Sequence, residues 1–231
     1  MNISGLQKLT LLDYPSHIAC TIFTHACNFR CPFCHNASLV IAPFKESFIP
    51  ESEVFSFLKK RVGILQGVCI TGGEPTLQHD LIPFIDKVKD LGYLVKLDTN
   101  GYRPDVLQQL ITAKMVDYIA MDIKNSKEKY AMTIGLDTFL LNHIEKSVEL
   151  LLRNDITYEF RTTVVQEYHS LDDFTLIGQW IKGASNYYLQ AYKDSKDLIK
   201  EGLHPRSKDE MLLIKEHLIP YIPSVSLRGI D

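Results

Sequence analysis

The segment Ile18-Ala19-Cys20-Thr21-Ile22-Phe23-Thr24-His25-Ala26-Cys27-Asn28-Phe29-Arg30-Cys31-Pro32-Phe33-Cys34 joins a short apolar run to three closely spaced cysteines. The apolar run is rich in β-forming residues, and we therefore expect residues 18–23 to form a strand. The cysteines follow it with the spacing C-x3-C-x2-C, so three thiol groups share one short loop. Soft sulfur ligands favour zinc or an iron–sulfur cluster over magnesium or calcium. The segment therefore predicts a strand with an inorganic centre at its end.

Strand-like and helix-like segments alternate along the rest of the chain. Apolar runs predict strands at 68–71, 93–97, 116–121, 156–165, 187–192 and 222–227. Helical spacing of apolar residues predicts helices at 54–62, 81–91, 106–113, 144–152, 174–181 and 211–218. Six β/α units imply a parallel sheet with outer helices. A complete eight-unit barrel takes about 250 residues, so we predict an α/β fold with an incomplete (β/α)6 TIM-like barrel; an open doubly wound sheet is the alternative.

The length of 231 residues suits one large domain or two small ones, and no convincing linker divides the chain. We therefore expect a single domain over residues 1–231. The 25 basic and 28 acidic residues leave a net charge of −3, and this charge balance is not typical of a nucleic-acid-binding protein. The N-terminus lacks the features of a signal peptide, and no apolar run approaches the roughly 20 residues that span a bilayer. We expect a cytoplasmic protein that binds neither nucleic acid nor membrane.

Five cysteines are present, and in a reducing compartment their crowding indicates a metal site rather than disulfides. A structural zinc site takes a fourth protein ligand, for which His35 is a candidate, but no distant pair of Cys or His residues is present. A cubane cluster held by three cysteines leaves one iron open to an outside ligand, which suits catalysis. The spacing thus favours an iron–sulfur cluster, and it leaves zinc and incidental core cysteines as alternatives. Cys20 and Cys69 lie in apolar runs, and we predict that both are core residues.

Glycines and polar residues gather where the predicted strands end. Thr71-Gly72-Gly73-Glu74-Pro75 follows the second strand, Asp98 and Thr99 end the third, and Asp122 and Lys124 end the fourth. Taken alone, these are a turn and ordinary strand-end polar groups. The carboxyl ends of parallel strands meet at one edge, however, where both candidate architectures place their chemistry. Two glycines without Cβ also let the backbone approach a ligand closely.

The cysteine loop, with the aromatic Phe33 before its third cysteine, resembles that of radical S-adenosylmethionine enzymes, and residues 71–75 resemble their GGE motif. More narrowly, the chain resembles glycyl-radical-enzyme activases, above all those of anaerobic ribonucleoside-triphosphate reductase, and it is similar to pyruvate formate-lyase activating enzyme. Four further stretches carry this likeness: Leu11-Leu12-Asp13-Tyr14-Pro15, Cys34-His35-Asn36, Leu97-Asp98-Thr99-Asn100-Gly101 and Met121-Asp122-Ile123-Lys124. The likeness extends from residue 5 to about residue 192.

The resemblance implies two cofactors, one [4Fe–4S] cluster and S-adenosylmethionine. It makes Cys27, Cys31 and Cys34 the cluster ligands, and it adds Lys124 to them as a catalytic residue. The residues implied around S-adenosylmethionine are Phe33, Gly72, Gly73, Glu74, Asp98, Thr99, Asp122, Lys124, Arg161 and Gln190. Among these, Glu74 would accept a hydrogen bond from the ligand's ammonium group, and Phe33 would lie near the adenine.

Several of the implied roles depend on the chemistry of one side chain. Oxygens of Asp98, Thr99 and Asp122 also imply a monovalent cation, since hard oxygen ligands suit such an ion. Arg161 matches a strand-borne arginine whose guanidinium fork fits a carboxylate in two-point contact, and a structural ion pair is the alternative. Gln190 stands where pyruvate formate-lyase activating enzyme has a histidine, and an amide can still hydrogen-bond a ribose.

The implied reaction is reductive cleavage of S-adenosylmethionine to a 5′-deoxyadenosyl radical, which takes the Cα hydrogen from a glycine of a partner protein. The implied partner is a glycyl radical enzyme, with anaerobic ribonucleotide reductase as the first candidate, and flavodoxin or ferredoxin is the implied electron donor. The glycine would enter the open barrel on an extended loop, because the missing side chain permits close approach. Two other hypotheses are a small-molecule radical enzyme similar to those of deazapurine biosynthesis and a noncatalytic zinc-binding module.

Overall fold

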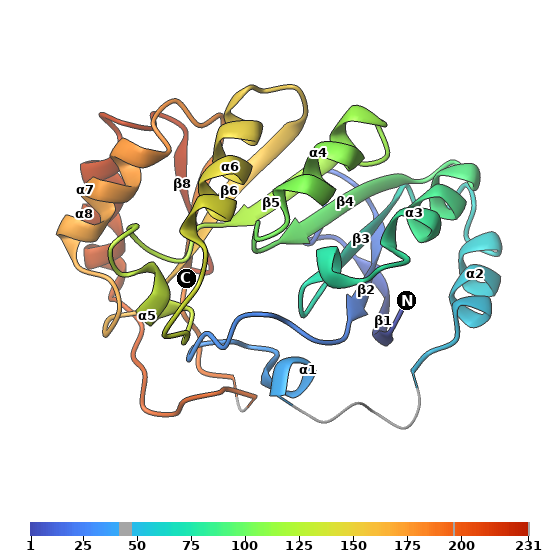
Figure 1. The fold of residues 1–231 in the computed structure, drawn as a ribbon, viewed down its shortest axis with the longest axis horizontal. Helices are drawn as coiled ribbons and strands as arrows, with labels where there is room; N and C mark the ends of the chain where they lie inside the picture. Colours follow the sequence, from blue (N-terminus) through green and yellow to red (C-terminus); the bar gives the residue numbers. More distant parts are fainter. Residues whose placement is uncertain (42–47, 196, 231) are drawn as a thin grey trace.

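A single curved sheet organises the fold (Figure 1). The computed structural model describes residues 1–41, 48–195 and 197–230. The eight strands neighbour one another in chain order: β1 (Ile3–Thr10), β2 (Ala19–Thr24), β3 (Gly67–Gly72), β4 (Leu94–Thr99), β5 (Tyr118–Asp122), β6 (Thr157–Val164), β7 (Tyr187–Ala191) and β8 (Val225–Arg228). β1 pairs with β2 in antiparallel orientation, and β2 through β8 are parallel. β1 and β8 form the two edges, so the sheet is open.

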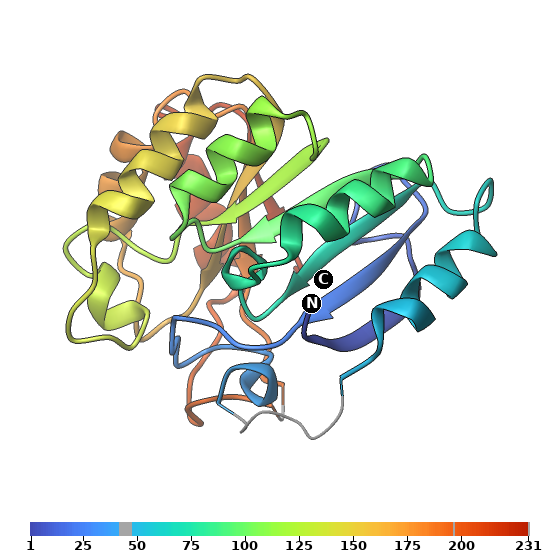
Figure 2. The same ribbon diagram turned by 45° about the vertical axis from the view of Figure 1, so that its right-hand side comes forward.

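Six helices follow the parallel strands in a regular order. They are α2 (Glu51–Lys59) after β2, α3 (Leu81–Asp90) after β3, α4 (Pro104–Thr112) after β4, α6 (Leu141–Leu152) after β5, α7 (Leu171–Trp180) after β6 and α8 (Lys208–Leu218) after β7. These helices lie on the outer side of the sheet (Figure 1 and Figure 2). The short elements α1 (Ala37–Ile41), η1 (Pro75–Leu77) and α5 (Tyr130–Thr133) lie in connections. None of the helices in the described ranges has the length and apolar character needed to cross a membrane.

The predicted architecture is confirmed. The seven predicted strands correspond to β2 through β8, and the predicted helices correspond to the six long ones. The chain thus forms six β/α units and a final strand, which is an incomplete (β/α)6 TIM-like barrel. The doubly wound alternative is wrong, because the strand order never reverses.

One strand, β1, is absent from the predicted elements. Its sequence, Ile3-Ser4-Gly5-Leu6-Gln7-Lys8-Leu9-Thr10, lacks the regular alternation of a half-buried strand. It pairs with β2 from Ile3 opposite Thr24 to Thr10 opposite Ala19, with two register shifts between these ends. Pairing with a neighbour, rather than local preference, makes this segment a strand.

The two faces of the sheet differ in polarity. Side chains that face the helices are apolar and buried, among them Ile22 of β2, Ile70 of β3 and Leu97 of β4. Alternate side chains of the strands face the interior of the partial barrel, where polar groups contact one another: Lys96, Asp98, Tyr118, Asp122, Glu159, Arg161 and Arg228. Because side chains alternate along a strand, one face builds the core and the other builds a polar interior.

The two cysteines outside the loop lie on opposite faces of the sheet. Cys20 is buried in the apolar core, as predicted. Cys69 is equally buried, but its Sγ lies 3.9 Å from Lys96 Nζ and 3.8 Å from Asp98 Oδ1 in the barrel interior. The prediction that Cys69 is a buried core residue is confirmed, and the period of two in a strand places it on the polar inner face of the sheet. Burial, together with the Asp98 carboxylate, raises the pKa of the Cys69 thiol well above its ordinary value.

Candidate functional site

A cavity of about 250 Å³ lies at the carboxyl ends of the parallel strands. Every residue that the sequence analysis assigned to a site lines this cavity: Cys27, Cys31, Phe33, Cys34, Gly72, Gly73, Glu74, Asp98, Thr99, Asp122, Lys124, Arg161 and Gln190. They come from the loops after β2 and β3, from the ends of β4 and β5, and from β6 and β7. The strand order therefore gathers residues from most of the chain at one place.

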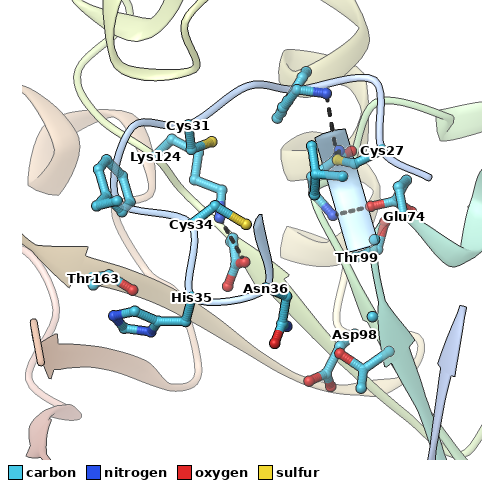
Figure 3. Close-up of a pocket in the computed structure, with 18 of the residues that line it drawn as sticks. Cys27, Cys31, Cys34, His35, Asn36, Glu74, Asp98, Thr99, Lys124 and Thr163 are labelled. Carbon is cyan, nitrogen blue, oxygen red and sulfur yellow. Dashed lines mark hydrogen bonds and ion pairs between the residues drawn. The ribbon is translucent and has the colours of Figure 1, made fainter. Parts of the chain in front are cut away.

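The cysteine loop is held by backbone contacts with later segments. Arg30 N–H donates to Ile134 O at 2.8 Å, and Lys200 N–H donates to Pro32 O at 2.9 Å. At the start of the loop, Ala26 adopts the left-handed region with a φ of 70°. Such a backbone is uncommon for alanine and persists where the surroundings enforce it. The loop is thereby fixed with its three cysteine side chains along the same cavity (Figure 3).

The three thiols lie in a desolvated environment. Burial raises the pKa of Cys27 to about 12 and that of Cys31 to about 11, and it also raises the pKa of Cys34. The Lys124 ammonium partly opposes this rise in the pKa of all three thiols. In the described ranges, no three His, Cys, Asp or Glu side chains converge closely enough to hold a single metal ion. Thiols must lose their protons to bind a metal, so metal binding here would release protons.

Gly72 and Gly73 allow two loops to approach each other closely. Gly73 N–H donates to Thr24 O at 2.9 Å, and Glu74 N–H donates to Ala26 O at 2.8 Å. A Cβ on Gly73 would lie 1.9 Å from Ala26 O, and a Cβ on Gly72, whose φ is 117°, would lie 2.3 Å from Thr24 N. Both glycines are therefore needed to seat the loop after β3 against the start of the cysteine loop.

We expect Gly73→Ala to destabilise the site, because the added methyl group must displace the Ala26 carbonyl. Overpacking of this kind costs about 1–3 kcal/mol of unfolding free energy. Chemical denaturation should show that loss, and anaerobic reconstitution should leave the variant with less iron per chain. Gly5→Ala is the matched control, since its Cβ would lie 3.4 Å from the Phe23 ring, an ordinary contact. Equal stability of the two variants would contradict the packing argument.

Glu74 is a buried carboxylate, 1% exposed, whose oxygens face protein donors. Its Oε1 accepts hydrogen bonds from Thr76 N at 3.0 Å and Thr99 Oγ1 at 2.7 Å, and its Oε2 accepts from Asn100 N at 2.7 Å. Burial raises the pKa of Glu74, and these hydrogen bonds oppose the rise. Glu74 therefore ties the loop after β3 to the end of β4, a contact separate from the ligand contact that the resemblance implies.

Arg161 links two carboxylates along one wall of the cavity. Its Nη1 donates to Asp98 Oδ2 at 3.0 Å, and its Nε donates to Asp122 Oδ1 at 3.0 Å. Lys124 Nζ lies 2.8 Å from Asp122 Oδ2, and Lys96 pairs with the other oxygen of Asp98. Burial alone would raise the pKa of Asp122, but Arg161 and Lys124 lower it to about 2. All four carboxylate oxygens thus accept from protein cations, and Arg161 adopts the structural ion-pair arrangement.

The rest of the lining combines an aromatic ring with polar groups. Phe33 is buried, and its ring centroid lies 5.8 Å from that of Tyr168. Gln190 of β7 lines the cavity, and its side-chain amide has no hydrogen-bond partner among the described residues. Lining residues that the predicted cluster and S-adenosylmethionine sets lack include His35, Asn36 and Asn100. His35 and Asn36 directly follow Cys34, and Asn100 directly follows Thr99. These positions within the quoted motifs are the sequence signal that could have identified them.

A second cavity, of about 410 Å³, shares Asp98, Arg161 and Gln190 with the first. Its remaining lining residues are Leu12, Asp13, Pro15, Lys96, Glu159, Arg228 and Gly229. Asp13 follows β1 and Arg228 ends β8, so both edges of the open sheet bound this cavity. Leu12, Asp13 and Pro15 therefore form part of a cavity wall.

The radical SAM superfamily pattern matches residues 21–181, which contain the cysteine loop and the ends of the strands from β2 to β6. The chain belongs to the radical SAM superfamily. A Methanocaldococcus jannaschii protein named "Putative glycyl-radical enzyme activating enzyme MJ1227" is 32% identical to this radical SAM protein over 235 residues, which cover 99% of this chain and 96% of the relative. The 7-carboxy-7-deazaguanine synthase of Thermoplasma acidophilum is 27% identical over 163 residues, 68% of this chain and 71% of that relative.

A solved structure shares this fold. SuiB of Streptococcus suis, bound to S-adenosylmethionine, has a TM-score of 0.70 and 13% identity to this radical SAM protein, over 88% of this chain and 48% of SuiB. Membership of the superfamily implies a [4Fe–4S] cluster and S-adenosylmethionine. The cavity fits these groups chemically, because three thiols share it with cationic, carboxylate and amide groups.

Proposed function

We propose that this radical SAM protein is a glycyl-radical-enzyme activating enzyme and that its partner is anaerobic ribonucleoside-triphosphate reductase. The proposal depends chiefly on one observation: the cavity of the three cysteines shares a wall with a second cavity, which both edges of the open sheet bound. A loop of another protein needs such an adjacent space to reach a reactive centre inside a barrel. The relative that matches 99% of this chain supports the activating-enzyme part of this proposal.

We assign Cys27, Cys31 and Cys34 as the ligands of the cluster, because three thiolates leave one iron open to S-adenosylmethionine. When bound, the cluster and S-adenosylmethionine together supply a 5′-deoxyadenosyl radical, which removes a hydrogen atom from the substrate. The chain contributes a desolvated environment around the thiols, since the rings of Phe29 and Phe33 are buried and line the cavity. Excluding water limits side reactions of a radical.

The other lining residues are assigned to S-adenosylmethionine. Lys124 offers positive charge to its carboxylate or hydrogen bonds to its ribose, while its ion pair with Asp122 holds the ammonium in place. Phe33 packs beside the adenine, and the free amide of Gln190 is available to the ribose. Gly72 lines the cavity and is assigned to the amino group of the ligand, and the full set adds Gly73, Glu74, Asp98, Thr99 and Arg161.

A monovalent cation near Asp98, Thr99 and Asp122 is a further part of the proposal. The carboxylate oxygens of Asp98 and Asp122 already accept from Arg161 and from two lysines. A cation bound there must therefore displace at least one of these ion pairs. Titration with potassium and sodium salts at constant ionic strength, followed by S-adenosylmethionine affinity, would reveal such a site.

We assign the second cavity to the glycine-bearing loop of the partner. The Arg228 guanidinium forms two hydrogen bonds with Glu159, at 2.6 and 2.7 Å, and lies 3.4 Å from the centroid of the Tyr188 ring. This wall is thereby held in one arrangement. The cavity mixes donors and acceptors, as a peptide backbone requires, and a glycine brings its Cα closest because it has no side chain. A flavodoxin or ferredoxin of the cytoplasm is the proposed electron donor.

Anaerobic incubation with S-adenosylmethionine, a reductant and anaerobic ribonucleotide reductase tests the proposed function. We expect an electron paramagnetic resonance signal from a radical on one glycine of the partner, and slow cleavage of S-adenosylmethionine without it. A peptide with the partner's glycine sequence should compete with activation. The same peptide with Ala in place of Gly should compete less well, because its methyl group obstructs the approach. Equal competition would argue against a pocket shaped for glycine.

A small-molecule radical enzyme is the second candidate, and the similarity to 7-carboxy-7-deazaguanine synthase over 163 residues favours it. Turnover of a free heterocycle without a protein partner would replace the activase assignment with this one. Metal analysis of the anaerobically prepared protein distinguishes a radical enzyme from a noncatalytic zinc module. About four irons per chain support the cluster, whereas one zinc per chain supports the module.

A further inference from the structure

The sulfur of Cys27 accepts hydrogen bonds from two N–H groups. Phe29 N–H donates to it at 3.3 Å, and Asn100 Nδ2 donates to it at 3.7 Å. The first donor belongs to the backbone of the cysteine loop and does not depend on the side chain. The second is a side chain from another segment, the one that follows β4. Asn100 is buried, so little water competes for this contact.

The other contacts of Asn100 fix the orientation of its amide. Its Oδ1 accepts from Tyr102 N at 3.0 Å, and its Nδ2 donates to Asn28 Oδ1 at 2.9 Å. Exchanging the oxygen and nitrogen would set two donors against each other at Tyr102 and two acceptors against each other at Asn28. The amide N–H groups therefore point at Asn28 and at the sulfur of Cys27.

Glu74 holds Asn100 in this position. Its Oε2 accepts from Asn100 N, and its Oε1 accepts from Thr99 Oγ1, which in turn accepts from Gly101 N at 3.0 Å. Cys27, Glu74 and Thr99 are drawn together at one end of the cavity in Figure 3. The loops after β2, β3 and β4 thus form one connected set of hydrogen bonds that ends on a cysteine sulfur.

We infer that Asn100 is a positioning residue that tunes the reduction potential of the cluster through Cys27. The inference rests on the proposed role of Cys27 as a cluster ligand. A hydrogen bond to a ligand sulfur stabilises the extra negative charge of the reduced state, and this raises the reduction potential. Asn100 therefore favours acceptance of the electron through its hydrogen bond to the sulfur of Cys27.

The test compares the unmodified chain with two variants. Asn100→Asp keeps the shape of the side chain and the acceptor for Tyr102, but it replaces the Nδ2 donor with an oxygen. Asn100→Leu removes the donor without adding charge. Each protein is reconstituted anaerobically, and its midpoint potential is measured without a partner by redox titration followed by electron paramagnetic resonance. At the midpoint of the unmodified chain, we expect the ratio of reduced to oxidised cluster to fall about tenfold in Asn100→Asp, which corresponds to about 59 mV for a one-electron couple.

Asn100→Leu should shift the ratio in the same direction by a smaller factor. Gln108→Leu is the matched control, because it removes an exposed side-chain amide on α4 outside the cavity, and it should keep the original midpoint. An unchanged midpoint in Asn100→Asp would overturn the inference, whether or not the Leu variant folds. An unmodified chain that binds no iron would overturn both the inference and the ligand assignment. A normal cluster with no radical transfer would overturn the activase proposal alone.

Discussion

Cys31→Ala is expected to abolish S-adenosylmethionine cleavage and to remove the bound iron, while the barrel remains folded. The thiol supplies one of three sulfurs along the cavity, and a cluster cannot be held stably by the remaining two. The loop itself is fixed by backbone hydrogen bonds at Arg30 and Pro32, which the substitution leaves intact. Iron analysis after anaerobic reconstitution, chromatography of 5′-deoxyadenosine and circular dichroism would measure the three effects. Cys27→Ala and Cys34→Ala should behave in the same way.

The two remaining cysteines are the matched controls. Cys20→Ala removes a sulfur from the apolar core, and Cys69→Ala removes one from the polar interior. Both variants should keep the iron, with any loss confined to the free energy of unfolding. If Cys69→Ala removed the iron while Cys31→Ala retained it, the ligand assignment would be wrong.

Arg161→Met is expected to lower the free energy of unfolding by about 3 kcal/mol, because two buried carboxylates lose the cation that they share. Arg161 is only 13% exposed, so water cannot replace the lost contacts well. It also belongs to the wall between the two cavities, and we therefore expect weaker binding of S-adenosylmethionine with no loss of iron. Chemical denaturation and an anaerobic binding titration would measure the two effects.

Arg103→Met is the control for the loss of an ion pair as such. Arg103 pairs with Asp105 at 2.7 Å on the surface, where it is 39% exposed, so the cost should stay below about 1 kcal/mol.

The free energy of unfolding, measured as the pH is lowered, gives a second test of the Arg161 ion pairs. The pKa of Asp122 is lowered to about 2, so its stabilising effect is present above its unfolded pKa of about 3.9 and is lost as pH falls toward 2. In Arg161→Met the folded-state pKa of Asp122 should rise, because burial raises it and one opposing cation is gone. The acid-induced loss of stability should therefore be smaller and end at a higher pH, and an unchanged acid limb would contradict the proposed network.

Local patterns in the sequence determined which elements and which chemical groups this protein has. Runs of β-forming residues and helical spacing predict β2 through β8 and six helices, because a strand and a helix bury side chains with different periods. The C-x3-C-x2-C spacing identifies three candidate ligands, since covalent connection alone keeps thiols on one short loop together. The positions of Asp98 and Asp122 at strand ends follow from the same local patterns.

The tertiary structure alone decided which of these groups face one another. β1 becomes a strand through its pairing with β2. Cys69 lies in the polar interior because its position in β3 falls on the inner face of the sheet. Arg161 meets Asp98 across 63 residues of sequence, and Asn100 meets Cys27 across 73. Contacts over such separations depend on strand order and register, and a shift of one residue would turn every side chain of a strand to the other face. No local pattern encodes that register, so the ion pairs and the sulfur contact appear only once the strands are assembled.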